Sequence, residues 1–166
     1  MLEAVEAEAI LITTDWCSHI RIAIDAMKHG MRPAMEVGGA GSVEECWRMV
    51  RTSEETGIPC MLLENCCYNS REMALLNMVR QGVFGEVTHC HGGYEHDLRD
   101  EIGWGDVRRH YCQDNFLNRN GELYPTHELG PIAKYLNINR GNRMVSLVSM
   151  ASKSAGLKEW FKNNRP

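Results

Sequence analysis

Short apolar runs alternate with amphipathic segments along the first half of the chain. Runs at residues 9–14, 32–37 and 58–63 have the length and composition of strands. The segments that follow them, residues 18–30, 42–57 and 69–82, carry apolar side chains at helical spacing. This alternation predicts βαβ units, and hence a parallel sheet covered by helices on both faces. The predicted fold class is therefore α/β.

Residues that start and stop helices agree with this division. Ser42 and Glu45 have the spacing of a capping box at the start of the second helix. Gly30 and Gly57 stand where the first two helices should end. The predicted order of strands and helices therefore rests on residues typical of helix ends as well as on the spacing of apolar residues.

The pattern changes near Gly82. Residues 85–93 alternate like a strand with one exposed face, whereas residues 95–120 are polar and irregular and predict a long loop or short helices. Residues 143–149 predict another strand, and residues 158–163 a short terminal helix. We therefore expect an α/β part over residues 1–82 and an α+β part over residues 83–166.

A loop-to-helix junction at residues 120–131 concentrates polar chemistry. Pro125 suits an entry turn, and Thr126 is the predicted N-cap of the helix that follows. Tyr124 and His127 should then project from the start of this helix. Two interpretations remain open, a functional site or a buried tyrosine–histidine hydrogen bond that steadies a loop.

Polar groups also follow the predicted strands, at residues 14–19, at Glu36 with Val37, and at Glu64 with Asn65. Carboxyl ends of parallel strands share one edge of a sheet, where open α/β sheets bind their ligands. These groups could line a nucleotide cleft, or they could be ordinary caps and turns.

Other motifs match no standard pattern. The glycines at residues 38–41 form neither GxGxxG nor a P-loop, so we expect a fragment or a chain that does not bind a dinucleotide alone. Histidines and cysteines between residues 89 and 112 fit no zinc spacing, and we predict no metal site. The adjacent Cys66 and Cys67 are expected to be packed thiols, because neighbouring residues rarely reach disulfide geometry.

Composition narrows the possible partners and compartment. The formal net charge of -4 argues against nucleic acid, and no apolar run reaches the length of a membrane span. Seven cysteines without a CxxC pair fit reduced thiols and favour the cytoplasm. The first residues lack the pattern of a signal peptide, and we expect the true N-terminus to be missing.

Several segments carry a resemblance to a known superfamily: TDWCSH (14–19), EV (36–37), ENCCY (64–68), GGYEHDLR (92–99), YPTHELGP (124–131) and NINRGNRM (137–144). With them, nearly the whole chain resembles the glucose–fructose oxidoreductase and inositol dehydrogenase superfamily. The last three segments resemble its NAD-dependent glycosidase branch, the α-N-acetylgalactosaminidase type of glycosyl hydrolase family 109.

The resemblance implies that residues 1–82 are the C-terminal part of a Rossmann NAD-binding domain. Residues 83–166 would be part of an α+β substrate domain with an open sheet. NAD would be the cofactor, and the implied contacts are Trp16, Cys17, Ser18, His19, Glu36, Val37 and Asn65. The implied sugar contacts are Tyr94, Cys112, Tyr124, Pro125, Thr126 and His127. Cys112 stands where the family pattern places an arginine.

The family mechanism is a redox-assisted elimination that retains the anomeric configuration and regenerates NAD+. His127, Tyr94 and Tyr124 would be its catalytic residues here, because an imidazole exchanges protons near neutral pH and the phenols can relay them. The expected substrate is a glycoside with a terminal N-acetylgalactosamine-like sugar, and a homo-oligomer is possible. Alternatives are a sugar or polyol dehydrogenase, and a truncated domain without catalysis.

Overall fold

The computed structural model describes residue 4 and residues 6–165. Two compact units divide the chain, Met1–Glu64 and Asn65–Pro166. The division falls earlier than Gly82, where the change in sequence pattern predicts a domain boundary. Across the described residues, every helix is too short or too polar to cross a membrane.

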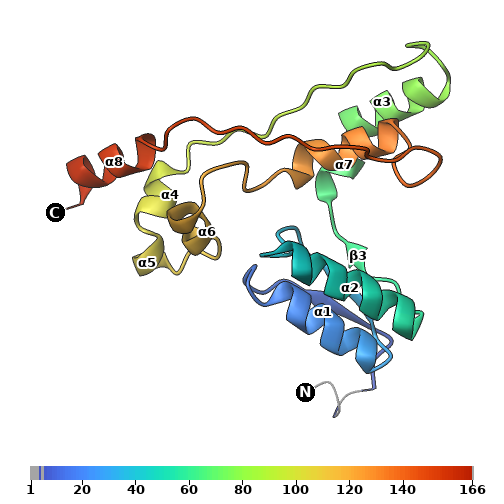
Figure 1. The fold of residues 1–166 in the computed structure, drawn as a ribbon, viewed down its shortest axis with the longest axis horizontal. Helices are drawn as coiled ribbons and strands as arrows, with labels where there is room; N and C mark the ends of the chain where they lie inside the picture. The colour runs from blue at the N-terminus through green and yellow to red at the C-terminus, as the bar shows by residue number, and fades with distance from the viewer. Residues whose placement is uncertain (1–3, 5, 166) are drawn as a thin grey trace. The chain divides into compact units, whose positions relative to one another are not determined.

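Unit 1 is a parallel sheet with two helical crossovers (Figure 1). Its elements are β1 (Ala9–Ile12), α1 (His19–Lys28), β2 (Arg32–Met35), α2 (Val43–Thr56) and β3 (Met61–Leu62). The strands lie in the order β1-β2-β3, with Ile12 beside Met35 and Met35 beside Leu62. The predicted α/β class and the parallel sheet are confirmed.

The core of unit 1 lies on one face of this sheet. Ile12 and Met35 pack there against α1 side chains, Ile20, Ala23, Ile24 and Met27. On the opposite face, Leu11 is 72% exposed and Met61 is 57% exposed. The prediction that helices cover both faces is therefore wrong for the described residues. Two crossovers of the same hand that step in the same direction, from β1 to β2 to β3, leave both helices on one face.

The predicted helix ends in unit 1 are confirmed. Ser42 is the N-cap of α2, and its hydroxyl accepts a hydrogen bond from the backbone N–H of Glu45 at 3.2 Å. The Glu45 carboxylate accepts in return from the N–H of Gly41 at 2.6 Å. Gly57 follows the helix with a φ of +68°, which glycine adopts without a steric cost.

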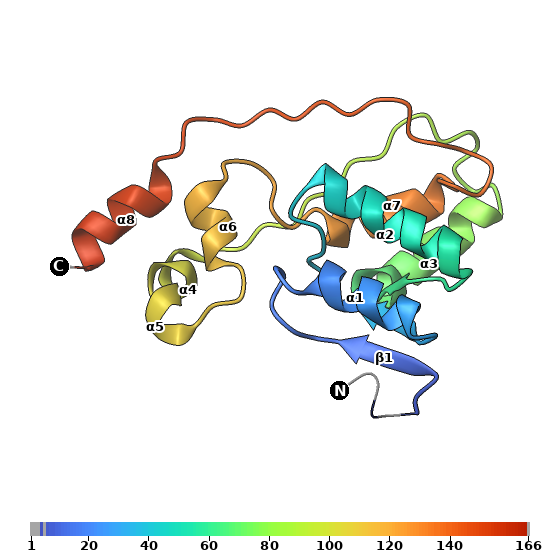
Figure 2. The same ribbon diagram turned by 60° about the horizontal axis from the view of Figure 1, so that its bottom comes forward.

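Unit 2 is built from helices joined by extended segments (Figure 2). They are η2 (Asn65–Tyr68), α3 (Ser70–Arg80), α4 (Arg99–Gly103), α5 (Gly105–Arg108), α6 (Gln113–Asn118), α7 (Thr126–Tyr135) and α8 (Gly156–Asn164). Helix α7 packs against η2 and α3, and the Tyr135 hydroxyl donates to the carbonyl of Glu72 at 3.3 Å. Helix α8 packs against α4. The short helices expected between residues 95 and 120 are confirmed.

The two strands predicted in the second part do not form. Residues 85–93 contain a bend at Glu86 and no regular secondary structure, and residues 143–149 are extended without a pairing strand among the described residues. In the second segment Val145 is 87% exposed and Leu147 is 90% exposed. Alternation gives a segment the capacity to pair, but a strand exists only where another strand offers its backbone groups.

The start of α7 also differs from the prediction. Pro125, not Thr126, is the N-cap, with φ −75° and ψ −6°. Its carbonyl accepts the hydrogen bond from the N–H of Leu129 at 2.9 Å. The first turn therefore begins one residue earlier than the prediction from the Thr126 hydroxyl, because the fixed φ of proline already suits a helix.

Candidate functional site

Four aromatic rings meet beside the start of α7 in unit 2. The ring centroids of Tyr94 and Tyr124 are 5.3 Å apart in a stacked arrangement. The His127 ring meets both edge-on, at 4.5 Å from Tyr94 and 4.6 Å from Tyr124. The centroid of the His96 ring lies 4.4 Å from that of Tyr94. We call Tyr94, His96, Tyr124 and His127 the ring cluster.

Local chain geometry brings Tyr124 and His127 together. They lie on either side of Pro125, so the first turn of α7 places their side chains next to each other. The backbone N–H of Tyr124 donates to the Glu122 carboxylate at 2.8 Å, which holds the residue before the turn in place.

Tyr94 reaches the cluster because of a glycine two residues earlier. A Cβ at Gly92 would lie 2.9 Å from Cβ of Glu128 and 3.0 Å from Cδ1 of Ile132, both on α7. Only glycine lets the extended chain approach the helix this closely without a shift of the neighbours. This close approach brings Tyr94 beside Tyr124 and His127.

Two buried polar atoms at the same helix start have no hydrogen-bond partner within the described residues. They are Oγ1 of Thr126 and Oε2 of Glu128. A buried polar atom left without a partner costs about 1–3 kcal/mol, so native structures usually satisfy it with protein, water or ligand. Hydroxyl groups of a bound sugar could supply the missing partners.

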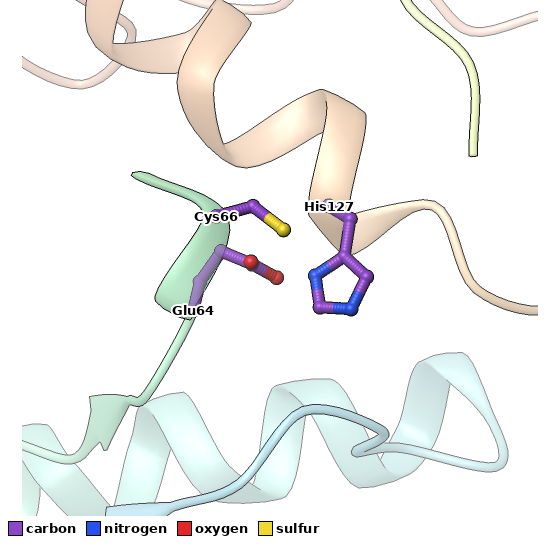
Figure 3. Close-up of side chains that lie close together, drawn as sticks. All are labelled: Glu64, Cys66 and His127. Carbon is purple, nitrogen blue, oxygen red and sulfur yellow. The ribbon is translucent and has the colours of Figure 1, made fainter. Parts of the chain in front are cut away.

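A carboxylate, a thiol and an imidazole also lie close together here, on Glu64, Cys66 and His127 (Figure 3). One ligand atom from each falls within 4.8 Å of the others. These donors could hold a divalent cation such as zinc, or pass a proton between oxygen, sulfur and nitrogen. The group does not include the histidines and cysteines between residues 89 and 112 that were considered from the sequence. Asn65 begins η2, which packs against the helix that carries His127.

Unit 1 collects the predicted cofactor residues at one edge of its sheet. Residues 16–19 follow β1, and Glu36 with Val37 follows β2, so both groups lie at carboxyl ends of parallel strands. Cys17 is exposed, whereas Trp16, His19 and Val37 are buried. The Glu36 carboxylate accepts from the N–H of Val37 at 2.9 Å.

Hydrogen bonds fix the turn after β1. The Ser18 hydroxyl donates to the carbonyl of Asp15 at 2.9 Å and lies 2.7 Å from the Thr14 hydroxyl. Nε2 of His19 lies 2.9 Å from the carbonyl of Thr14, while Nδ1 of this fully buried ring has no partner among the described residues. The Trp16 ring packs on the backbone of Gly38, where φ is +119° and a Cβ would overlap the indole.

Cys112 lies in a different environment from the other predicted sugar contacts. Its side chain is 3% exposed, and Sγ lies 3.2 Å from Nδ1 of His110. The backbone N–H of Cys112 donates to the same nitrogen at 3.4 Å. Burial, with a smaller effect from the charge of Glu101, raises the pKa of the Cys112 thiol to about 11. The thiol is therefore protonated at neutral pH and occupied by a local contact.

The sequence alone did not single out three of the side chains that lie close to Tyr94 and His127. Glu64 and Cys66 were noted only as a strand-end carboxylate and a packed thiol, and His96 only as a metal candidate. Their neighbours in sequence gave a usable signal, because each lies within two residues of Asn65 or Tyr94, which were predicted.

The parallel βαβ unit places the chain in the α/β class of proteins. More narrowly, the chain belongs to glycosyl hydrolase family 109, because residues 68–166 match the family's C-terminal domain model, "Glycosyl hydrolase 109, C-terminal domain".

The chain is also similar to individual known proteins. The chain is 44% identical to an alpha-N-acetylgalactosaminidase of Bacteroides fragilis, over 99% of this chain and 40% of that protein. It spans about two fifths of the length of the curated relatives it matches. An oxidoreductase structure from Klebsiella pneumoniae shares its fold with a TM-score of 0.51 and 16% identity, over 66% of this chain and 32% of that one. An Agrobacterium radiobacter oxidoreductase, solved in complex with NAD+, L-tartaric acid and magnesium, has a TM-score of 0.49 and 26% identity, over 52% and 25% of the two chains.

Gly92→Ala should lower the free energy of unfolding by about 1–3 kcal/mol, because the new methyl group overlaps α7 side chains. Gly93→Ala is the matched control, since a Cβ there would meet only Oε1 of Glu95, at 3.9 Å. Urea unfolding followed by circular dichroism measures both variants. Equal stability of the two would show that the Gly92 contact does not hold the segment.

Cys112 should resist alkylation in the folded protein. With a pKa of about 11, roughly one thiol in a thousand is ionised at pH 8, and burial also blocks access to it. Exposed Cys17 and Cys46 serve as internal controls. Iodoacetamide labelling followed by peptide mass spectrometry should show both of them modified before Cys112, and the difference should vanish in urea. Labelling of Cys112 at the rate of Cys17 in native buffer would contradict its burial.

Proposed function

We propose that the protein to which this chain belongs is an NAD-dependent glycosidase that releases terminal N-acetylgalactosamine-like sugars. The observation that carries the proposal is the ring cluster, in which Tyr94, Tyr124 and His127 come together from segments about 30 residues apart. Membership of glycosyl hydrolase family 109 and the similarity to an alpha-N-acetylgalactosaminidase support it.

The ring cluster carries the kinds of groups that bind sugars. Aromatic faces pack against the apolar face of a pyranose, and phenol and imidazole groups hydrogen-bond to its hydroxyls. The buried oxygens of Thr126 and Glu128 provide further acceptors at the same helix start. The sugar would thereby satisfy two polar atoms that have no partner among the residues that the structure describes.

His127 would accept and donate the proton that is exchanged with the sugar during the reaction. An imidazole can both accept and donate a proton near neutral pH, so Nδ1 or Nε2 can take a proton from a sugar hydroxyl or carbon and later return it. The Glu64 carboxylate and the Cys66 thiol, each with an atom within 4.8 Å of a ring nitrogen, would exchange that proton with the ring. Tyr94 and Tyr124 would orient the sugar and relay protons through their hydroxyls.

NAD would be held by the polar strand ends of unit 1 and by Asn65. The buried Nδ1 of His19, which has no partner in the described part of the chain, and the Trp16–Gly38 packing at that edge fit a nucleotide-binding role. When bound, NAD supplies a reversible hydride transfer at a sugar carbon. Such chemistry does not need the paired carboxylates of ordinary glycosidases, so the ring cluster suffices without them.

His127→Ala in the full-length protein should reduce cleavage of an aryl α-N-acetylgalactosaminide by at least about 100-fold, because the proton-transfer group is lost. NAD+ affinity should stay nearly the same, since His127 is assigned to the sugar and not to the cofactor. Steady-state kinetics and NAD+ titration by calorimetry measure the two effects. His89→Ala, at an exposed histidine, is the control and should keep normal turnover.

Near-normal turnover in His127→Ala would remove this residue from the mechanism. Accumulation of one NADH for each sugar consumed by the wild-type protein, without release of the aglycone, would instead indicate a sugar dehydrogenase.

A further inference from the structure

A cavity of about 560 Å³ opens in unit 2. It lies among the segment before α4, α4 itself, α6 and α8, elements that group together in Figure 2. The residues that line it are Glu95, His96, Asp97, Leu98, Arg99, Ile102, Phe116 and Leu157. Its size is within the range of small-molecule sites.

The cavity combines an apolar lining with charged side chains, and the arginine among its described lining residues, Arg99, is paired. Leu98, Ile102, Phe116 and Leu157 supply the apolar side chains. On the rim, the Arg99 guanidinium donates to both carboxylate oxygens of Asp97, at 2.8 Å and 2.6 Å.

The charges on this rim disfavour an anion. Hydrogen bonds from Arg99 lower the pKa of Asp97 to about 2, so this pair stays ionised and mutually neutralised over the working pH range. Glu95 adds a further carboxylate. An anionic ligand would therefore meet net negative charge, whereas a neutral apolar ligand would meet mainly hydrocarbon.

His96 connects this cavity to the ring cluster. Its side chain lines the cavity, and its ring lies 4.4 Å from the Tyr94 ring at an angle of 45°. A substrate whose sugar lies against Tyr94 would therefore extend past His96 into the cavity with the group attached to that sugar.

We propose that this cavity is the aglycone site of the enzyme and that it takes a neutral, flat, apolar leaving group such as an aryl ring. The inference rests on the proposed glycosidase function and adds the class of aglycone to it. Phe116 is the side chain placed to stack on such a ring, and Leu157 closes the cavity from α8.

The contacts of α8 keep the Leu157 wall in position. Arg165, just after this helix, donates to the carbonyl of Gly103 at 2.7 Å and to the Asp106 carboxylate at 2.7 Å and 3.0 Å. The Trp160 ring packs directly on Gly103, where a Cβ would overlap it. The cavity is thus bounded on one side by a helix that is attached to α4 and α5.

The test measures binding of two probes of similar size by NMR titration of the protein at pH 7. 4-Methylphenol is neutral at this pH, and 4-methylbenzoate is its anionic counterpart. The wild-type protein should bind 4-methylphenol more tightly than 4-methylbenzoate. Phe116→Ala should weaken 4-methylphenol binding about five- to tenfold, the value of one aromatic contact.

Leu117→Ala is the matched control, because this neighbour on α6 is 54% exposed and does not line the cavity. It should bind 4-methylphenol like the wild type. Leu157→Ala supplies an independent variant from another helix, should Phe116→Ala fail to fold by circular dichroism. Equal affinity of wild type and cavity variants for 4-methylphenol, or preference for the anion, would overturn the proposal.

Kinetics with the full-length protein complete the test. Phe116→Ala should raise KM for a 4-methylphenyl glycoside and leave KM for the methyl glycoside unchanged. An unchanged KM for both glycosides would overturn the aglycone assignment. Because probe binding needs no turnover, Phe116-dependent binding by a protein that cleaves no glycoside would reject the proposed function while leaving an aryl-binding cavity.

Discussion

The close approach of Gly92 to α7 is the constraint on which the candidate site depends. No side chain larger than hydrogen fits between this backbone and Glu128 and Ile132 without movement of the helix side chains. The contact sets the position of the extended chain, and Tyr94, two residues later, then meets Tyr124 and His127. Phenol and imidazole groups from two segments distant in sequence thereby lie side by side.

The two units contribute different chemistry by different physical means. In unit 1, parallel pairing gathers polar residues at the carboxyl edge of a small sheet, and hydrogen bonds of Ser18 and His19 fix the turn after β1. In unit 2, packing of helix pairs and close glycine contacts position the ring cluster and the neighbouring cavity. His96 belongs to both the ring cluster and the cavity, so the proposed sugar position and the proposed aglycone position would be continuous.

Sequence reasoning succeeded where the determinants are local. Apolar periodicity and the Ser42–Glu45 capping box gave the elements of unit 1, because nearest-neighbour geometry decides them. The pairing of Tyr124 with His127 follows from their spacing across Pro125. The helix start at Pro125 was misplaced by one residue, since a proline with helical φ and ψ already accepts the first hydrogen bond.

Prediction from the sequence failed where the structure depends on contacts between residues far apart in the chain. Residues 143–149 alternate like a strand, yet pairing depends on another strand that no local pattern reveals. The burial of Cys112, which is 3% exposed, is likewise a result of packing that its neighbours in sequence do not reveal. Tyr94 was named through the resemblance, whereas the Gly92 contact that positions it is visible only in three dimensions.

The most direct measurement is a titration of the protein with N-acetylgalactosamine, followed at the imidazole ring resonances by heteronuclear NMR. If the ring cluster binds the sugar, the His127 and His96 resonances should shift together in a saturable manner. The exposed His89 and His29 resonances should not move. Saturable shifts confined to other residues, with the His127 and His96 rings unchanged, would contradict the placement of the sugar at this site.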